Sequence, residues 1–146
     1  MRLVAIQWAE RRDSLARGLA RGRSLEVVDW LEKPFDQDRL VVTGGEPLLQ
    51  APALARLLTL LSGMHVEIET NGTVAPPVRL DIRVDQYNVS PKLAHSGNPA
   101  ELALLPERLD AWAIEPRAFV KFVIATPADV DEVLALHRRY RFRPER

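Results

Sequence analysis

This sequence of 146 residues contains no cysteine. Its residues therefore cannot supply a disulfide, a thiolate nucleophile, a cysteine-type zinc site or the thiolate ligands of an iron–sulfur cluster. Histidine is also scarce, because the three histidines, His65, His95 and His137, are far apart and lack the paired spacing of a metal site. The composition thus excludes thiol chemistry and disfavours a metal centre built on histidine.

Excess charge and long apolar runs are absent as well. Basic and acidic residues number 20 each, so no net charge attracts the chain to nucleic acid. No apolar run approaches the roughly 18 residues of a membrane-spanning helix, and the first residues, MRLVAIQWAERR, lack the apolar core and cleavage site of a signal peptide. Since 47% of the residues are hydrophobic, we expect one soluble, cytoplasmic domain over residues 1–146, without a membrane partner.

Positive charge is concentrated in one segment, residues 9–23, which contains Arg11, Arg12, Arg17, Arg21 and Arg23. A solvated helix face or ordered loop is the favoured interpretation, and contact with phosphates is the alternative. Because no aromatic residues are interleaved to stack on bases, nucleic acid is disfavoured as a partner.

The stretch that organises the chain is VVTGGEPLLQ, residues 41–50. An apolar run ends at Gly44 and Gly45, which permit unusual backbone geometry and close approach of a ligand. Pro47 ends the strand and suits the start of a helix. Glu46 would then lie at a strand-to-helix turn, where a carboxylate can meet a cationic ligand group. The alternative interpretation is a tight turn with a solvated acid.

Apolar periodicity and turn residues predict an α/β fold with a mainly parallel sheet. We expect strands over residues 2–8, 39–43, 65–70, 84–89 and 119–125, and helices over residues 24–33, 47–63 (capped by Gly63), 99–105 and from 126 onward. The short links around the helix after Pro47 predict that its two flanking strands are parallel neighbours. Residues 95–117 should otherwise be rich in loops, and the last helix should carry an apolar stripe of Val130, Val133 and Leu134.

Polar, sharply turning segments follow three of these strands, at residues 43–47, 69–73 and 90–92. Ligands of parallel α/β folds bind on the loops at the carboxyl ends of strands, so these segments should converge. Two acids, Glu46 and Glu69, complement an ammonium group, and Lys92 complements a carboxylate. The set therefore matches an amino acid headgroup. Neither a GxGxxG nor a Walker A sequence is present, which disfavours nucleotide phosphate binding of those kinds.

In order and spacing, VVTGGEPLLQ, IETNGT, VSPKL and FVKFVIA resemble the 7-carboxy-7-deazaguanine synthases, over residues 24–136. These are radical S-adenosylmethionine enzymes of queuosine and deazapurine biosynthesis. The resemblance implies a partial, modified (β/α) barrel, often as a homodimer. It also implies ring contraction of 6-carboxy-tetrahydropterin, a lyase-type reaction that uses S-adenosylmethionine, a [4Fe–4S] cluster and Mg²⁺.

The resemblance assigns roles to individual residues. Gly44, Gly45 and Glu46 match the segment that holds the methionine amino group. Glu69 and Asn71 match a second loop that faces S-adenosylmethionine, and Ser90 and Lys92 match a third. Thr43 matches a position near the pterin.

The sequence departs from the family in the N-terminal loop, where three cysteines normally hold the cluster. Arg2-Leu3-Val4-Ala5 and Asp13-Ser14 resemble the framing of that loop, but its cysteine positions hold Ile6, Glu10 and Asp13 in one register, or Ala5, Ala9 and Arg12 in another. We interpret residues 1–23 as a remnant of the cluster loop and residues 24–146 as the partial barrel. A [4Fe–4S] cluster is not expected, and Asp13 and Ser14 are the candidates for Mg²⁺.

Two hypotheses follow. The first is a degenerate or truncated homologue that keeps part of the S-adenosylmethionine and 6-carboxy-tetrahydropterin pocket but does not perform radical chemistry by itself. The alternative is a non-catalytic binding or assembly protein, which pairs with a homologue or touches nucleic acid through its arginine-rich N-terminus.

Overall fold

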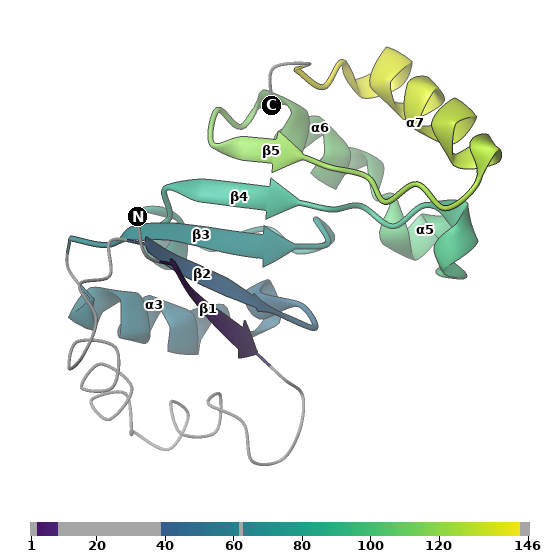
Figure 1. Ribbon diagram of the computed structural model, residues 1–146. Coiled ribbons are helices and arrows are strands. Elements are labelled where there is room, and N and C mark those ends of the chain that lie inside the picture. The colour runs from purple at the N-terminus through teal and green to yellow at the C-terminus, as the bar shows by residue number, and fades with distance from the viewer. Residues whose placement is uncertain (1–2, 9–38, 62, 144–146) are drawn as a thin grey trace. The chain divides into compact units, whose positions relative to one another are not determined.

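The computed structural model describes residues 3–8, 39–61 and 63–143, with the backbone alone for residues 3–8 (Figure 1). The predicted helix over residues 24–33, the arginines of residues 9–23 and the candidates Asp13 and Ser14 lie outside the described residues. The chain divides into two compact units. The first consists of Met1–Glu69 and Pro76–Gln86, and the second of Thr70–Ala75 and Tyr87–Arg146.

Parallel strands form the base of the first unit, in the order β1 (Leu3–Trp8), β2 (Arg39–Gly44) and β3 (His65–Thr70). Leu3 pairs with Arg39 in the register of β1 and β2, and Arg39 pairs with His65 in the register of β2 and β3. The parallel pairing predicted for the two strands around the helix is therefore confirmed.

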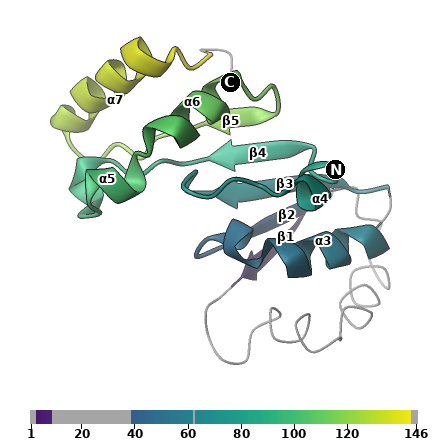
Figure 2. The ribbon, with the colours of Figure 1, turned by 180° about the vertical axis from the view of Figure 1, so that it is seen from behind.

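The connection between β2 and β3 starts with a 3₁₀ turn, η1 (Pro47–Gln50), and continues as helix α3 (Ala51–Leu60). Leu54, Leu57 and Leu58, which lie on one face of the helix, are buried in the core of the unit. The predicted glycine cap is wrong, because the helix is capped by Leu61, whose backbone is extended and whose side chain is buried. A short helix that was not predicted, α4 (Val78–Asp81), lies on the same side of the strands as α3 (Figure 2).

The polar side of β3 is not simply solvated. Glu67 is buried, and its carboxylate forms an ion pair with Arg39 on the neighbouring strand and contacts Gln86 Nε2 at 3.5 Å. A buried carboxylate requires such partners, since removal from water without them is costly. The sequence predicted the bounds of this strand, 65–70, but not the burial of Glu67.

The second unit contains β4 (Gln86–Val89) from Tyr87 onward, and this strand pairs in parallel with β5 (Ala118–Val120), with Tyr87 beside Ala118. Its helical elements are η2 (Ala94–Ser96), α5 (Ala100–Ala103), α6 (Pro106–Ile114) and α7 (Pro127–Tyr140). A core cluster joins α6 and α7 through Leu109, Tyr140 and Phe142. The fold class is thus α/β with parallel pairing, as predicted.

Two of the predicted strands are too long. The last strand was expected over residues 119–125, but β5 ends at Val120, and Val123 and Ile124 are 59% and 49% exposed. The physical reason is its neighbour: β4 ends at Val89, whose carbonyl accepts the amide of Lys121. Beyond Val89, β4 offers no further backbone to pair with, so β5 cannot extend. The other strand, β4, begins at residue 86 rather than residue 84.

Helical expectations in this unit were partly wrong. Residues 95–117 contain the helix α6 rather than mainly loop, with Pro106 in its first turn and Leu109 and Trp112 buried on one side. The predicted stripe on α7 is only partly buried, because Val130 and Leu134 are 47% and 48% exposed. Among the described residues, no helix is long and apolar enough to cross a membrane.

Candidate functional site

The first predicted site segment is a turn at the end of β2. Gly44 has a φ of 132°, a backbone conformation that side chains other than hydrogen rarely adopt. Glu46 caps η1, because its Oε1 accepts the amide of Leu48 at 3.1 Å. The predicted strand-to-helix turn is confirmed. Glu46 is also the N-cap of η1, a role that was not predicted from the sequence. A carboxylate at an N-cap is recognisable from sequence, so the position before Pro47 carried that signal.

The second segment, after β3, is a turn held by its own side chains. Thr70 Oγ1 accepts the amide of Gly72 at 3.0 Å. Asn71 Oδ1 accepts both the amide and the hydroxyl of Thr73, at 2.9 and 2.7 Å. Such bonds from Asn to the backbone two residues on define an Asx-turn. The turn is therefore held by bonds among its own residues.

This turn is also supported from α6. Trp112 Nε1 donates a buried hydrogen bond of 2.9 Å to the carbonyl of Gly72. The indole ring packs on Tyr87 of β4, with ring centroids 5.1 Å apart. A Cβ on Gly72 would lie only 2.8 Å from Val89 Cγ1, so the backbone approaches β4 too closely for a larger residue. Sequence reasoning missed Trp112 because it did not predict α6.

The third segment, Ser90 to Lys92, lies directly beside the second. The amide of Ser90 donates to the carbonyl of Thr70 at 2.8 Å, which joins the ends of the two loops. Pro91 and Leu93 are buried, whereas Lys92 between them is exposed. Lys92 is thus an exposed residue whose two neighbours in the sequence are buried.

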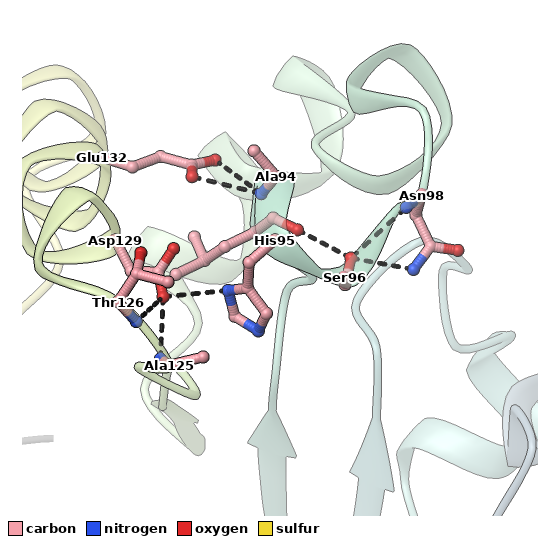
Figure 3. A network of polar contacts seen from close by, with 9 residues as sticks. Ala94, His95, Ser96, Asn98, Ala125, Thr126, Asp129 and Glu132 are labelled. Carbon is pink, nitrogen blue, oxygen red and sulfur yellow. Dashed lines mark hydrogen bonds and ion pairs between the residues drawn. The ribbon is translucent and has the colours of Figure 1, made fainter.

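Beyond Leu93, the chain is tied to the start of α7 (Figure 3). His95 Nδ1 lies 3.0 Å from Asp129 Oδ2, and the same oxygen accepts the amides of Ala125 and Thr126, each at 2.7 Å. Thr126 and Asp129 form a capping box. Burial raises the pKa of Asp129, but hydrogen bonds from both amides, from His95 and from the Thr126 hydroxyl together hold it below the ordinary value.

The structure divides the predicted residues between its units. Thr43, Gly44, Gly45, Glu46 and Glu69 belong to the first unit, whereas Asn71, Ser90 and Lys92 belong to the second. Within the second unit, Thr70 brings the Asn71 and Ser90 segments to one place. Convergence of all three loops stays a prediction.

We also searched the described residues for a metal site and for a cavity lined by the predicted site residues. No three or more histidine, aspartate or glutamate side chains gather there as a metal site. A cavity of about 620 Å³ lies between α3 and residues 77–83, and none of the predicted site residues lines it.

Comparison with known proteins supports the resemblance carried by the motifs. No family model matches the chain. Curated proteins named 7-carboxy-7-deazaguanine synthase do match: that of Pyrobaculum aerophilum is 42% identical over 96 residues, 64% of this chain and 40% of the relative. That of Hyperthermus butylicus is 35% identical over 123 residues, 81% of this chain and 52% of the relative. The protein of Halobacterium salinarum is 35% identical over 129 residues, 76% of this chain and 48% of the relative. The chain therefore spans about half the length of the curated relatives that it matches.

Proposed function

Because this chain is a homologue of the 7-carboxy-7-deazaguanine synthases, we propose that it retains the part of their pocket that binds S-adenosylmethionine. Gly44, Gly45 and Glu46 would receive the methionine amino group, with Glu69 as a second acid. Asn71, Ser90 and Lys92 would complete the site, and Thr43 would lie near 6-carboxy-tetrahydropterin.

The observation that carries this proposal is the internally bonded turn at residues 70–73. The bonds from the Thr73 amide and hydroxyl to Asn71, the Thr70–Gly72 bond and the support from Trp112 fix the backbone around Asn71. A turn fixed in advance loses little conformational entropy on binding. Beside it, Lys92 offers a cation, which is the partner that an amino acid carboxylate requires.

The iron–sulfur cluster of the family does not fit the residues present. A [4Fe–4S] cluster requires thiolate ligands in this family, and none of the 146 residues is cysteine. We therefore assign no reaction step through a cluster and propose that this chain does not perform radical chemistry by itself. The same proposal includes a role in queuosine or deazapurine biosynthesis and a location in the cytoplasm. It also includes a homodimer and Mg²⁺ binding at Asp13 and Ser14.

Calorimetric titration with S-adenosylmethionine tests the retained pocket. We expect saturable binding that weakens roughly tenfold in E69Q, because one charge-assisted contact to the amino group is worth about 1.5 kcal/mol or more. The control variant is E101Q, which removes an exposed carboxylate on α5 and should bind like the wild type. A nucleoside analogue without the amino acid headgroup should not distinguish E69Q from the wild type. Absence of any heat of binding at millimolar ligand would refute the retained pocket.

A second candidate function is assembly with a homologue, as a non-catalytic partner. This candidate is supported by apolar side chains that are each at least 38% exposed and that another chain can cover, namely Phe119, Val123, Ile124, Val130 and Leu134. Light scattering on this chain mixed with a full-length homologue tests this candidate, because an assembly role requires a complex of the two chains. A homodimer of this chain alone fits both candidates, whereas failure to form the mixed complex would eliminate assembly. Contact of the arginine-rich N-terminus with nucleic acid requires salt-dependent RNA binding.

A further inference from the structure

Two carboxylates of α7 hold the turn η2, which follows Lys92 closely (Figure 3). Glu132 accepts the amide of Ala94 through both oxygens, at 3.1 and 3.3 Å. Asp129 Oδ2 contacts His95 Nδ1 at 3.0 Å. We call these contacts, made by Ala94, His95, Asp129 and Glu132, the α7 latch.

Asp129 is a fixed anchor for the latch. Its side chain is 4% exposed, and one oxygen accepts two backbone amides that start α7. Hydrogen bonds outweigh its burial and favour the ionised form, so the proton shared with His95 must be on Nδ1. A hydrogen bond to an ionised carboxylate is stronger than a hydrogen bond between two neutral groups. His95 thus makes a directed contact rather than a loose surface pairing.

The latch closes one end of the segment that presents Lys92. At the other end, the amide of Ser90 donates to Thr70, and Pro91 is buried. Leu93, which separates Lys92 from the latch, is 1% exposed. The backbone of Lys92 is therefore held from both directions, while Lys92 as a residue is exposed.

We propose that His95 and Glu132 are positioning residues, which hold the segment from Ser90 to Ala94 on α7 and so preorganise Lys92 for an anionic group of the ligand. This inference rests on the proposed function, because it assigns Lys92 to the carboxylate of S-adenosylmethionine. Neither His95 nor Glu132 is proposed to touch the ligand. Their effect is to reduce the conformational freedom that Lys92 loses on binding.

The alternative is that bonds within the turn itself, rather than the α7 latch, fix the segment. Ser96 Oγ donates to the carbonyl of Leu93 at 2.6 Å and contacts Asn98 Nδ2 at 2.9 Å. These bonds belong to the turn itself and involve no residue of α7. If they alone fix the segment, loss of the latch will change neither backbone protection nor ligand affinity.

Hydrogen exchange of the ligand-free full chain, followed at the amides of residues 93–98, tests the latch directly. E132A, which removes both acceptor oxygens of Glu132, and H95L should each accelerate exchange about fivefold or more at Ala94. H95N should restore protection relative to H95L, because Asn Nδ2 is attached to Cγ like His Nδ1 and can donate to Asp129. The matched controls are D131A and H137N, which alter exposed groups on α7. Unchanged exchange in both E132A and H95L would overturn the latch.

The same variants, titrated with S-adenosylmethionine, test positioning. We expect a roughly threefold to tenfold loss of affinity in E132A and H95L, recovery in H95N, and wild-type affinity in the controls. Faster exchange with unchanged affinity would overturn positioning and leave a structural contact. If the wild type binds no S-adenosylmethionine, the proposed function fails and the positioning of Lys92 fails with it. The exchange data then still decide whether the latch holds the segment.

Discussion

At the scale of single residues, two glycines share a left-handed backbone but differ in their surroundings. Gly72 and Gly97 have φ values of 83° and 74°. A Cβ on Gly72 would lie 2.8 Å from Val89 Cγ1 and 3.4 Å from Trp112 Nε1, whereas a Cβ on Gly97 would meet no atom within 4 Å. The backbone strain is therefore common to both positions, and the steric clash is specific to Gly72.

This difference predicts the effects of two alanine substitutions. G97A should lower the free energy of unfolding by about 1 kcal/mol, the cost of a left-handed residue with a side chain. G72A should lower it by about 2–4 kcal/mol, because displacement of Val89 or Trp112 adds to that strain. Urea unfolding of both variants provides the measurement. Equal losses would mean that the turn does not pack against β4 as tightly as described.

Single residues also show what the sequence can and cannot predict about the site. Asn71-Gly72 is a turn dipeptide, and the turn lies where it was predicted. The support from Trp112 crosses 40 positions of sequence and depends on α6, which local patterns did not reveal. The burial of Glu67 likewise depends on the pairing of β3 with β2, because Arg39 comes from the other strand.

At the scale of elements, α7 depends on the charge at its first turn. Asp129 completes the capping box, and its pKa lies below the ordinary value of 3.8, because hydrogen bonds to the carboxylate outweigh the opposing effect of burial. Since the pKa is lower in the folded chain than in the unfolded chain, the stabilisation is full above about 3.8 and is lost as the pH falls through the folded pKa.

We therefore expect D129N to unfold at a lower temperature than the wild type at neutral pH, and to lose less stability than the wild type when the pH falls below 3.8. Thermal unfolding followed by circular dichroism between neutral pH and about pH 3 measures both effects. The control D131N, which removes an exposed carboxylate from the same helix, should keep the pH dependence of the wild type. Parallel curves for the wild type and D129N would contradict the assigned role.

Elements whose signals are local were predicted well. The capping box and Pro127 mark the start of α7, and β3 has the predicted bounds. The end of β5 is not encoded in its own residues, because FVKFVIA continues to look like a strand after Val120. The strand stops where β4 stops, at Val89, so its length depends on a segment about 30 positions away in the sequence.

At the scale of the whole molecule, the resemblance and the composition point in different directions. The motifs at the strand ends resemble those of the 7-carboxy-7-deazaguanine synthases, and relatives of that name share 35–42% identity with the chain. The chain spans about half of their length and provides no thiolate. Binding of S-adenosylmethionine and its reductive cleavage are therefore separable properties, and each has its own measurement.

Cleavage is tested by anaerobic reconstitution of this chain with iron and sulfide. We expect no bound [4Fe–4S] cluster and no 5′-deoxyadenosine from S-adenosylmethionine, because the 146 residues contain no cysteine to ligate iron. The full-length relative from Pyrobaculum aerophilum, treated in parallel, controls for the reconstitution itself. A bound cluster with turnover in this chain would demonstrate ligands other than cysteine and would refute the proposed loss of radical chemistry. Binding of S-adenosylmethionine without a cluster would instead identify a chain that keeps the ligand site apart from the reaction.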